Sequence, residues 1–456
     1  MSNEKDLYAK RKKIYPRTVS GLFNNLRVVS VLSLMGIYYL IPWINWNGRQ
    51  MILYDLPARK FYFFDTIIWP QDFFYLALLL IIAALALFFF TNLMGRVWCG
   101  YACPQTVWTQ ISFWLDRLTV GSRQSQIKLA KMPWNFYKTS RISLKFIVWI
   151  VFVLWTGLTF VGWFSPIRGL FTDVINFNAS ITETFWIGFY AFATWGMAGF
   201  LREQVCFYMC PYARFQSVMF DHNTLIISYD YNRGEPRGKM QKGKIAEGNG
   251  DCVDCGICVQ ACPTGIDIRD GLQYECIACT ACIDACDEVM EKVGLAKGLV
   301  RYTTENALLG KVSKILRPRL VMYGLVLIIF MISFVFALGN RNPLDLNIIR
   351  DRSSLYQEDN EGNILNIYTL KLMNMDSRAH EFDLSINSND IKDIKIKADF
   401  SSLNIKSGGL IEVPLNLSAD PTSINNQSNE VIFTLQAKED SSLFIKVPTR
   451  FIGPTN

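Results

Sequence analysis

Eight cysteines between residues 252 and 286 constrain the fold of this chain more than any other feature of its sequence. The first four have the spacing C-x2-C-x2-C-x3-C-P, and the next four repeat it without the proline. Three thiolates at this spacing bind one [4Fe–4S] cluster, and in two-cluster ferredoxins the fourth cysteine of each run binds the other cluster. The repeat therefore predicts an α+β ferredoxin module at residues 251–300 that carries two [4Fe–4S] clusters.

The same rule assigns four ligands to each cluster. Cluster one is expected to be bound by Cys252, Cys255, Cys258 and Cys286. Cluster two is expected to be bound by Cys276, Cys279, Cys282 and Cys262. Asp287 stands where the first run has proline, which could loosen the turn there or alter the potential of one cluster. Structural zinc is the weaker interpretation, because zinc needs no double run of four cysteines.

Five apolar runs are each long enough, at ~20 residues, to cross a bilayer as a helix. These runs are Val28–Trp46, Phe73–Leu93, Leu144–Phe164, Thr184–Leu201 and Leu320–Leu338. They predict an α-helical membrane bundle at residues 28–220, with a connection and a last spanning helix at 301–338. The chain is thus expected to be a multi-domain protein of the lipid bilayer.

Lysine and arginine are concentrated in the N-terminal tail (residues 1–27) and in the connection between the second and third runs. An excess of these residues marks the cytoplasmic side of a membrane protein. The tail, this connection and residues 202–319 are therefore predicted to be cytoplasmic, and with five spans the region from about residue 340 is outside. All twelve cysteines fall in the cytoplasmic segments, as expected of reduced thiols. The net charge of +7 lies beside the apolar runs, which indicates membrane topology rather than nucleic-acid binding.

Four further cysteines form a second repeat, C-x3-C-P, just past the inner ends of the second and fourth runs. They are Cys99, Cys103, Cys206 and Cys210. Proline disfavours helix in the residue before it and suits the first turn of a helix, so helices are predicted to open at Pro104 and Pro211. The first of these has an apolar stripe that could lie flat on the membrane surface. A helix start favours thiolate, and Arg96, Arg202 and Arg214 could add to this effect.

Two copies of the C-x3-C-P motif at equivalent positions favour a functional role over simple packing. That role could be soft-metal ligation, because thiolates suit Cu(I), or it could be dithiol redox chemistry. The spacing alone leaves both possibilities open.

Two histidines, His222 and His380, are the only ones in the chain, and neither lies in an apolar run. A transmembrane haem relay held by pairs of histidines is therefore not expected. No glycine-rich nucleotide motif follows a strand, so flavin and nicotinamide binding have no support. The clusters are expected to receive electrons from a separate cytoplasmic or membrane donor, and His222 is expected to be a surface residue.

The two remaining regions are polar. Residues 221–250 are rich in glycine and charge and are predicted to be a linker to the ferredoxin module. Residues 339–456 alternate apolar and polar positions between turn-forming clusters, which predicts an all-β, immunoglobulin-like sandwich. This region has no catalytic constellation, so a binding or docking role is expected of it.

The sequence resembles the CcoG/FixG/RdxA family, whose members are accessory factors for assembly of cbb3-type cytochrome oxidase. The resemblance covers nearly the whole chain and rests on four strings: RVWCGYACPQTVW, CFYMCPYARFQ, ISYDYNRGEPRG and PTGIDIRDGLQYECIACTACIDAC. It implies a protein of the bacterial cytoplasmic membrane with an outer β-sandwich. It also implies reduction of Cu(II) to Cu(I), with Cys99, Cys103, Cys206 and Cys210 as the reacting and copper-binding residues, and copper-handling or oxidase-assembly partners.

Related polyferredoxins of the nitrate and nitrous oxide systems share C-x3-C-P pairs and are associated with electron transfer from quinol, so the motif does not by itself indicate copper. Three functions therefore remain open. The first is a metalloreductase, the second is a quinol- or protein-linked electron relay, and the third is an assembly scaffold. The sequence leaves the oligomeric state open.

Overall fold

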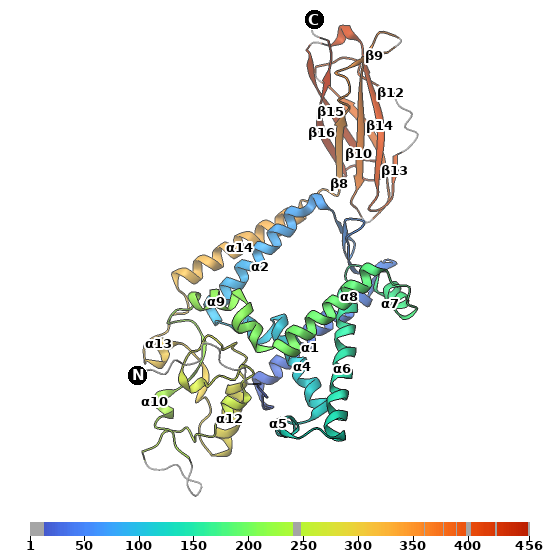
Figure 1. The fold of residues 1–456 in the computed structure, drawn as a ribbon. Coiled ribbons are helices and arrows are strands. Elements are labelled where there is room, and N and C mark those ends of the chain that lie inside the picture. Colours follow the sequence, from blue (N-terminus) through green and yellow to red (C-terminus); the bar gives the residue numbers. More distant parts are fainter. Residues whose placement is uncertain are drawn as a thin grey trace, which may run out of the picture. The chain divides into compact units, whose positions relative to one another are not determined.

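The computed structural model describes residues 13–239, 248–359, 361–376, 378–388, 390–397, 403–424 and 426–454. The chain divides into two compact units. The membrane–ferredoxin unit comprises Met1–Ile44 and Leu78–Ile332, and the sandwich unit comprises Asn45–Ala77 and Ser333–Asn456. Figure 1 shows the elements of both units along the chain.

Among the described residues, four helices are long and apolar enough to cross a membrane. They are Leu22–Trp43, Pro70–Met94, Phe136–Val161 and Pro318–Gly339, and they coincide with four of the five predicted spans. They contain α1 (Leu22–Leu40), η1 (Ile41–Trp43), η2 (Pro70–Asp72), α2 (Phe73–Met94), α6 (Phe136–Val161) and α14 (Pro318–Gly339). Shorter helices of the same region are α3 (Val97–Tyr101), α4 (Pro104–Val120), α5 (Arg123–Lys131), α7 (Ile167–Ile175) and α9 (Pro211–Met219).

The fifth predicted span, Thr184–Leu201, has a different backbone. Regular α-helix in α8 (Ile181–Thr194) is 14 residues long. The chain then continues as π-helix in η3 (Trp195–Leu201) and again in η4 (Val205–Met209). π-Helical turns are rare and frequently occur at functional sites, and these two lead into the second C-x3-C-P motif. The crossing of a membrane by this segment stays a prediction.

Helix α1 begins six residues before the predicted start of its apolar run because a distant carboxylate caps it. The backbone N–H of Asn24 donates to Asp284 Oδ2 at 2.6 Å, and that of Phe23 donates to Asp284 Oδ1 at 3.3 Å. A carboxylate at a helix start accepts hydrogen bonds from unpaired N–H groups and interacts favourably with the helix dipole. Gly21 allows this approach, since a Cβ there would collide with the Asp284 carboxyl group.

A buried ion cluster holds the membrane helices together around Asp116 of α4. This carboxylate is 3 % exposed and pairs with Lys145 of α6 at 2.7 Å and with Arg202 at 2.8 Å. Burial alone would raise the pKa of the Asp116 carboxyl, but the two cations lower it below its usual value, so the group stays ionised. The cluster therefore fixes α4 and α6 against the segment that carries the second C-x3-C-P motif.

The apolar stripe of α4 packs inside the protein. Val107 is 1 % exposed, and Val107, Ile111 and Trp114 pack with Val31 and Met35 of α1. The expectation that this stripe lies flat on the membrane surface is therefore wrong for these residues. Packing the apolar face of α4 against that of α1 buries the apolar surface of both helices, and this burial is favourable.

The ferredoxin module begins earlier than predicted. It contains β6 (Ile226–Tyr229), α10 (Tyr231–Gly234), α11 (Ile257–Ala261), η5 (Ile268–Asp270), α12 (Ala281–Lys292), β7 (Val300–Thr303) and α13 (Glu305–Leu308). Strand β6 pairs antiparallel with β7, and Tyr229 lies opposite Val300. The segment predicted as a linker thus contributes a strand and a helical turn to the module, while its residues 240–247 lie outside the described residues.

The sandwich unit confirms the predicted all-β region. One sheet has the order β12 (Lys395–Lys397), β14 (Leu410–Ala419), β10 (Ile364–Asn374), β8 (Leu344–Arg350), with β9 (Gln357–Glu358) beside β10. The other has the order β13 (Leu403–Ile405), β11 (His380–Asn387), β15 (Ser428–Ala437), β16 (Phe444–Ile452). All their pairs are antiparallel, and alternate residues of β10 are buried. Tyr368, Leu370 and Phe433 lie in the core between the sheets, and the strands run alongside one another in Figure 1.

The first connection of the membrane region belongs to the sandwich unit. It forms β1 (Asn45–Trp46), β2 (Arg49–Gln50), β3 (Ile52–Asp55), β4 (Lys60–Phe63) and β5 (Thr66–Ile68). Trp69 packs with Met373 and Met375 of the β-sandwich. Arg341 pairs with Asp72 at 2.6 Å. The sequence predicts that both segments lie outside the membrane, and their packing in one unit is consistent with a common side.

Replacing Asp116 by asparagine should lower the stability of the membrane–ferredoxin unit. The change leaves Lys145 and Arg202 without their carboxylate, and breaking a buried ion pair costs about 3–5 kcal/mol. We expect the midpoint of thermal unfolding in detergent to fall by at least ~5 °C. Asp173→Asn, which removes the same charge from an exposed position of α7, should leave the midpoint unchanged. Equal midpoints for the two variants would contradict a structural role of the ion cluster.

Candidate functional site

Two neighbouring cavities in the ferredoxin module are each lined by four or more cysteines. The first, of about 360 Å³, is lined by Cys252, Cys255, Cys258 and Cys286. The second, of about 330 Å³, is lined by Cys258, Cys262, Cys276, Cys279 and Cys282. These sets contain the four cysteines that the spacing assigns to each cluster, and Cys258 lines both cavities. Cys255 is exposed, whereas Cys279 is buried, so the first cavity is the one nearer to solvent.

The loops around the two cavities have the same backbone conformation at equivalent positions. Asp254 and Gly256 have φ of +48° and +62°, and Ala278 and Thr280 have φ of +53° and +61°. Positive φ is unfavourable for residues with a side chain and persists where the surroundings enforce it, often at functional sites. When residues of positive and negative φ alternate, successive backbone N–H groups point to the same side of the loop and form an anion-binding concavity.

The cavities fit iron–sulfur clusters better than single ions. Among the described residues, no three His, Cys, Asp or Glu side chains come close enough to hold one metal ion. A [4Fe–4S] cube keeps its four thiolates apart and fills the space between them. Burial raises the pKa of the Cys276 and Cys286 thiols to about 12, because a buried thiolate without a cation is unfavourable. A bound metal cluster removes this cost.

Asp287, which replaces the expected proline, has a structural partner. Its Oδ1 accepts a hydrogen bond from the backbone N–H of Gly298 at 2.8 Å. The carboxylate thereby ties the middle of α12 to the loop that leads into β7. Because α12 continues through Cys286 and Asp287, this position has no turn to loosen, and a proline here would interrupt the helix.

The two C-x3-C-P motifs begin helices as predicted. Cys103 is the N-cap of α4 and Pro104 its first residue, while Cys210 is the N-cap of α9 and Pro211 its first residue. The motifs differ in what precedes them, since α3 comes before Cys103 and the π-helical η4 comes before Cys210. The two motifs thus have the same structure where their following helices begin, but not in the segments that precede them.

The two motifs lie together in the fold. Cys99 Sγ donates to Oε1 of Gln216 in α9 at 3.3 Å, and Gln216 is fully buried. The pKa of Cys99 also responds to Cys103 and Cys206, which means that thiols of both motifs are within electrostatic range. Tertiary contact thus brings two segments more than 100 residues apart in sequence to one site.

The helix start at Cys103 does not activate its thiol. Burial raises the pKa of Cys99 and Cys206 to about 12, and it also raises that of Cys103. At Cys103 the N–H groups of Gln105 and Thr106 do lower the pKa, as the sequence suggests, but burial outweighs them. The expectation of thiolates at this position is therefore wrong for the metal-free protein.

Arg96 joins the C-x3-C-P site to the ferredoxin module. Its guanidinium is 6 % exposed and donates to the carbonyl oxygens of Tyr274, Cys276 and Ala213. Tyr274 and Cys276 belong to the loop of the second cavity, whereas Ala213 belongs to α9. A single buried cation therefore fixes α9, the first motif and the loop of cluster two in one arrangement.

The first motif also touches that loop directly. A Cβ at Gly100, between Cys99 and Cys103, would lie 2.5 Å from the carbonyl oxygen of Ala278. Cys99 packs in the same apolar cluster as Cys279, and Tyr101 Oη lies 2.7 Å from Thr280 Oγ1. Glycine is required here because the two backbones are in contact.

A third cavity, of about 410 Å³, lies between the second motif and the loop of cluster two. Cys206 and Cys279 both line it, together with Arg27, Arg202 and Glu203. Arg27 donates to the carbonyl oxygen of Cys279 at 3.1 Å. Thiols of both motifs are thus adjacent to the loop that carries the ligands expected for cluster two.

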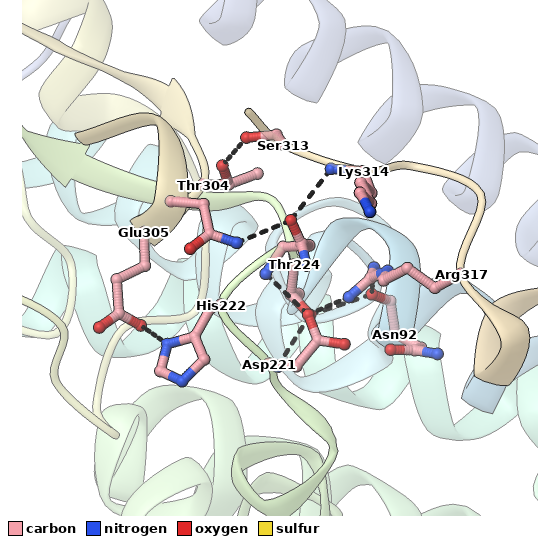
Figure 2. Close-up of polar contacts among 11 residues, drawn as sticks. Asn92, Asp221, His222, Thr224, Thr304, Glu305, Ser313, Lys314 and Arg317 are labelled. Carbon is pink, nitrogen blue, oxygen red and sulfur yellow. Dashed lines mark hydrogen bonds and ion pairs between the residues drawn. The ribbon is translucent and has the colours of Figure 1, made fainter. Parts of the chain in front are cut away.

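The described histidines have structural partners. His222 Nδ1 lies 2.7 Å from Glu305 Oε2, and both side chains are more than half exposed (Figure 2). His380 Nε2 lies 2.6 Å from Asp376 in the sandwich unit. Neither lies in a membrane-spanning helix, and His222 is the surface residue that the sequence predicts.

A polar network beside His222 connects the ferredoxin module to two membrane helices. Figure 2 shows Arg317, just before α14, directed toward Asp221 and toward the end of α2. Arg317 pairs with Asp221 and donates to the carbonyl oxygen of Asn92 at 2.8 Å, and Thr224 Oγ1 donates to the same oxygen at 3.1 Å. Sequence reasoning missed this network and the contacts of Gly100 and Gln216. Gly100, inside the string CGYAC, was the one residue in the sequence that could have indicated a close backbone contact.

Replacing Gly100 by alanine should disturb the second cavity selectively. The added Cβ meets backbone atoms of Ile277 and Ala278, which cannot move without displacing Cys276 and Cys279. We expect iron content to fall toward half of that in wild type, with loss of one of two cluster signals in electron paramagnetic resonance. Gly188→Ala, a helical glycine with open space around it, is the matched control. Full iron content in both variants would show that the close contact is not needed.

Comparison with known proteins gives three family matches. Residues 201–305 match the 4Fe-4S dicluster domain, and residues 76–121 match a 4Fe-4S binding domain. Residues 334–454 match the domain described as the IG-like fold at the C-terminal of FixG, putative oxidoreductase. The segment 76–121 contains two cysteines, Cys99 and Cys103, which is half of the set that one cluster needs.

The chain is similar to several curated proteins over most of its length. It is 40% identical to Protein RdxB of Cereibacter sphaeroides over 397 residues, covering 84% of this chain and 83% of RdxB. It is 38% identical to the nitrogen fixation protein FixG of Rhizobium meliloti, covering 83% of this chain and 80% of FixG. The ferredoxin-type protein NapH of Haemophilus influenzae is 25% identical over 41% of this chain and 66% of NapH. The chain therefore belongs to the FixG/RdxA/RdxB family and is an iron–sulfur electron-transfer protein of the membrane.

Proposed function

We propose that this protein is a metalloreductase of the bacterial cytoplasmic membrane that reduces Cu(II) to Cu(I) during assembly of cbb3-type cytochrome oxidase. The single observation that carries the proposal is the backbone contact between Gly100 and Ala278, which joins the C-x3-C-P site to the loop of cluster two. Electron transfer needs such proximity, and Cys99 packs in the same apolar cluster as Cys279.

Each cavity holds one [4Fe–4S] cluster in this proposal. Cluster one is bound by Cys252, Cys255, Cys258 and Cys286, and cluster two by Cys262, Cys276, Cys279 and Cys282, in agreement with the cysteines that line the two cavities. A [4Fe–4S] cluster, when bound, accepts and releases one electron at a time. The exposed Cys255 marks the side at which a reduced donor reaches the module, and the buried Cys279 lies on the side of the C-x3-C-P site.

Copper is the substrate that the chemistry of the C-x3-C-P site favours. Four cysteines supply soft sulfur ligands, which stabilise Cu(I) relative to Cu(II). Each Cu(II) ion takes up one electron and becomes Cu(I), while the thiols release protons as they bind the ion. Gln216 Oε1 accepts from the Cys99 thiol, and a half-turn of this amide would present its Nε2 donor to Cys99 once the thiol is ionised.

The proposed sidedness follows from charge and from the units of the fold. The N-terminal tail and the ferredoxin module are cytoplasmic in this arrangement, and the sandwich is periplasmic. The packing of the first connection against the β-sandwich supports a common side for these two segments. The immunoglobulin-like domain is then positioned to bind a copper-handling or oxidase-assembly partner outside the membrane.

A second candidate function is an electron relay without copper chemistry. The similarity to NapH favours it, because that relative is described as a ferredoxin-type protein and ferredoxins carry electrons on iron–sulfur clusters. In a relay, quinol or a protein would donate or accept electrons and the C-x3-C-P cysteines would serve another role. The two candidates differ in whether Cu(II) reduction depends on those four thiols.

The assignment of cluster ligands predicts a selective loss. Cys286→Ala should abolish cluster one and retain cluster two, although Cys286 belongs to the second cysteine run. Iron analysis and electron paramagnetic resonance of the purified protein would measure this. Cys262→Ala is the reciprocal variant and should abolish cluster two alone. Loss of cluster two in the Cys286 variant would contradict the crossed assignment.

The copper site predicts a large effect of removing the four thiols. Changing Cys99, Cys103, Cys206 and Cys210 to alanine should lower the rate of Cu(II) reduction at least ~100-fold, since the substrate loses all of its soft ligands. The rate is measured with chemically reduced protein and a Cu(I)-specific chelator. Met209→Leu, which removes a thioether next to Cys210, should reduce Cu(II) at the wild-type rate.

Iron content decides how a slow quadruple variant is interpreted. The copper proposal expects the variant to keep all of its iron. A wild-type rate of Cu(II) reduction would refute the proposal and favour the relay. A loss of about four irons per chain would show that the four cysteines hold a third cluster instead of copper.

A further inference from the structure

A cavity of about 510 Å³ beside the start of α1 is lined by three arginines and by no carboxylate. Arg17 comes from the segment before α1, Arg27 from α1 itself and Arg117 from the last turn of α4. Asn24 and Gln110 add neutral polar groups. All of these residues belong to the membrane–ferredoxin unit. The cavity therefore concentrates positive charge without a counter-ion from its own walls.

Arg27, the buried arginine of the three, lacks a hydrogen-bond partner for one of its N–H groups. Arg27 is 7 % exposed, and its Nη atoms donate to Cys279 and Asn24, but its Nε has no hydrogen-bond partner among the described residues. A buried donor without a partner costs free energy, and the cost is larger when the group is charged. An anion in the cavity would offset this cost.

The other two arginines support the same inference. Among the described residues, neither Arg17 nor Arg117 has an ion pair with a carboxylate. Burial and the positive charge of Arg27 together lower the pKa of Arg117. The backbone N–H of Arg17 donates to Gln260 at 2.8 Å, which holds this segment against the ferredoxin module. Glu288 attracts Arg17 electrostatically, but among the described residues no carboxylate lines the cavity in which the three cations meet.

The location of the cavity indicates the type of anion. Leu22 and Leu26, at the same end of α1 but on the face away from the lining residues, are 68 % and 51 % exposed, and Leu118 next to Arg117 is 76 % exposed. Exposed leucines at the end of a membrane-spanning helix lie where acyl chains meet headgroups. Arginine binds phosphate through planar, charge-assisted hydrogen bonds, and basic pockets of this kind bind lipid phosphates.

We propose that Arg17, Arg27 and Arg117 form a binding site for a phosphate group, supplied by an anionic phospholipid of the surrounding membrane. The site is distinct from the C-x3-C-P cysteines, although Arg27 and Phe113 also line the cavity that reaches Cys206. A lipid bound here contacts the segment before α1, α4 and the ferredoxin module at Ala261 and Ala281. It therefore stabilises the docking of that module at the membrane surface.

The test uses the full-length, cluster-loaded protein in a nonionic detergent. Native mass spectrometry would measure how much phosphatidylglycerol and how much phosphatidylcholine remain bound. We expect wild type to retain phosphatidylglycerol in clear excess, and Arg17→Gln with Arg117→Gln to lower its retention by about tenfold. Lys128→Gln with Lys131→Gln, which removes two exposed charges of α5, is the matched control and should retain phosphatidylglycerol like wild type.

Two further measurements keep the proposal open to refutation. Arg117→Lys keeps the charge and should retain most of the lipid, which separates loss of charge from loss of folding. Iron content and visible absorption should be equal in all variants. Equal retention of phosphatidylglycerol in the two double variants, or no preference over phosphatidylcholine in wild type, would overturn the site. Displacement of bound lipid by millimolar inorganic phosphate would support a site for free phosphate, and persistence of the lipid would support the phospholipid as its source.

Discussion

The buried guanidinium of Arg96 is the interaction on which the arrangement of the redox groups depends. It joins its own segment to two others that are far away in sequence. It donates to main-chain carbonyl oxygens of the loop at Tyr274 and Cys276 and of Ala213 in α9. Gly100 and Tyr101 contact the same cysteine loop, and Arg96 adds the charged hydrogen bonds of this junction. Because Arg96 lies between the first C-x3-C-P motif and the cysteine loop of cluster two, it holds the two redox sites in contact.

Buried arginines recur wherever the membrane helices meet the ferredoxin module. Arg27, Arg96, Arg202 and Arg317 are each at most 7 % exposed. Each donates to a carbonyl oxygen, and Arg202 and Arg317 also pair with an aspartate. Arg96 lowers the pKa of Cys99, Cys206 and Cys276, and Arg27 lowers that of Cys279, in each case against the larger effect of burial. The positive charge of this chain thus contributes to the electrostatics of its redox site as well as to its topology.

Several local features were predictable because they depend on neighbours in sequence. The helices that open at Pro104 and Pro211 follow from the geometry of proline, and four membrane helices follow from apolar length. Predictions failed where distant residues intervene. Asp284 extends α1, Asp116 neutralises Lys145 inside α6, and burial outweighs the helix start at Cys103. No window of sequence contains these pairs.

The sequence by itself determined the chemistry: eight cysteines in a ferredoxin spacing, two C-x3-C-P pairs, and apolar runs that require a membrane. These features are local, so the cysteine spacing and the length of an apolar run can be recognised from the sequence without knowledge of the fold. Only the tertiary structure decided that the two pairs come together, that Gly100 touches Ala278, and that three arginines share one cavity. Such contacts arise because packing joins segments of high sequence separation, and burial then sets which groups ionise and which backbones can approach.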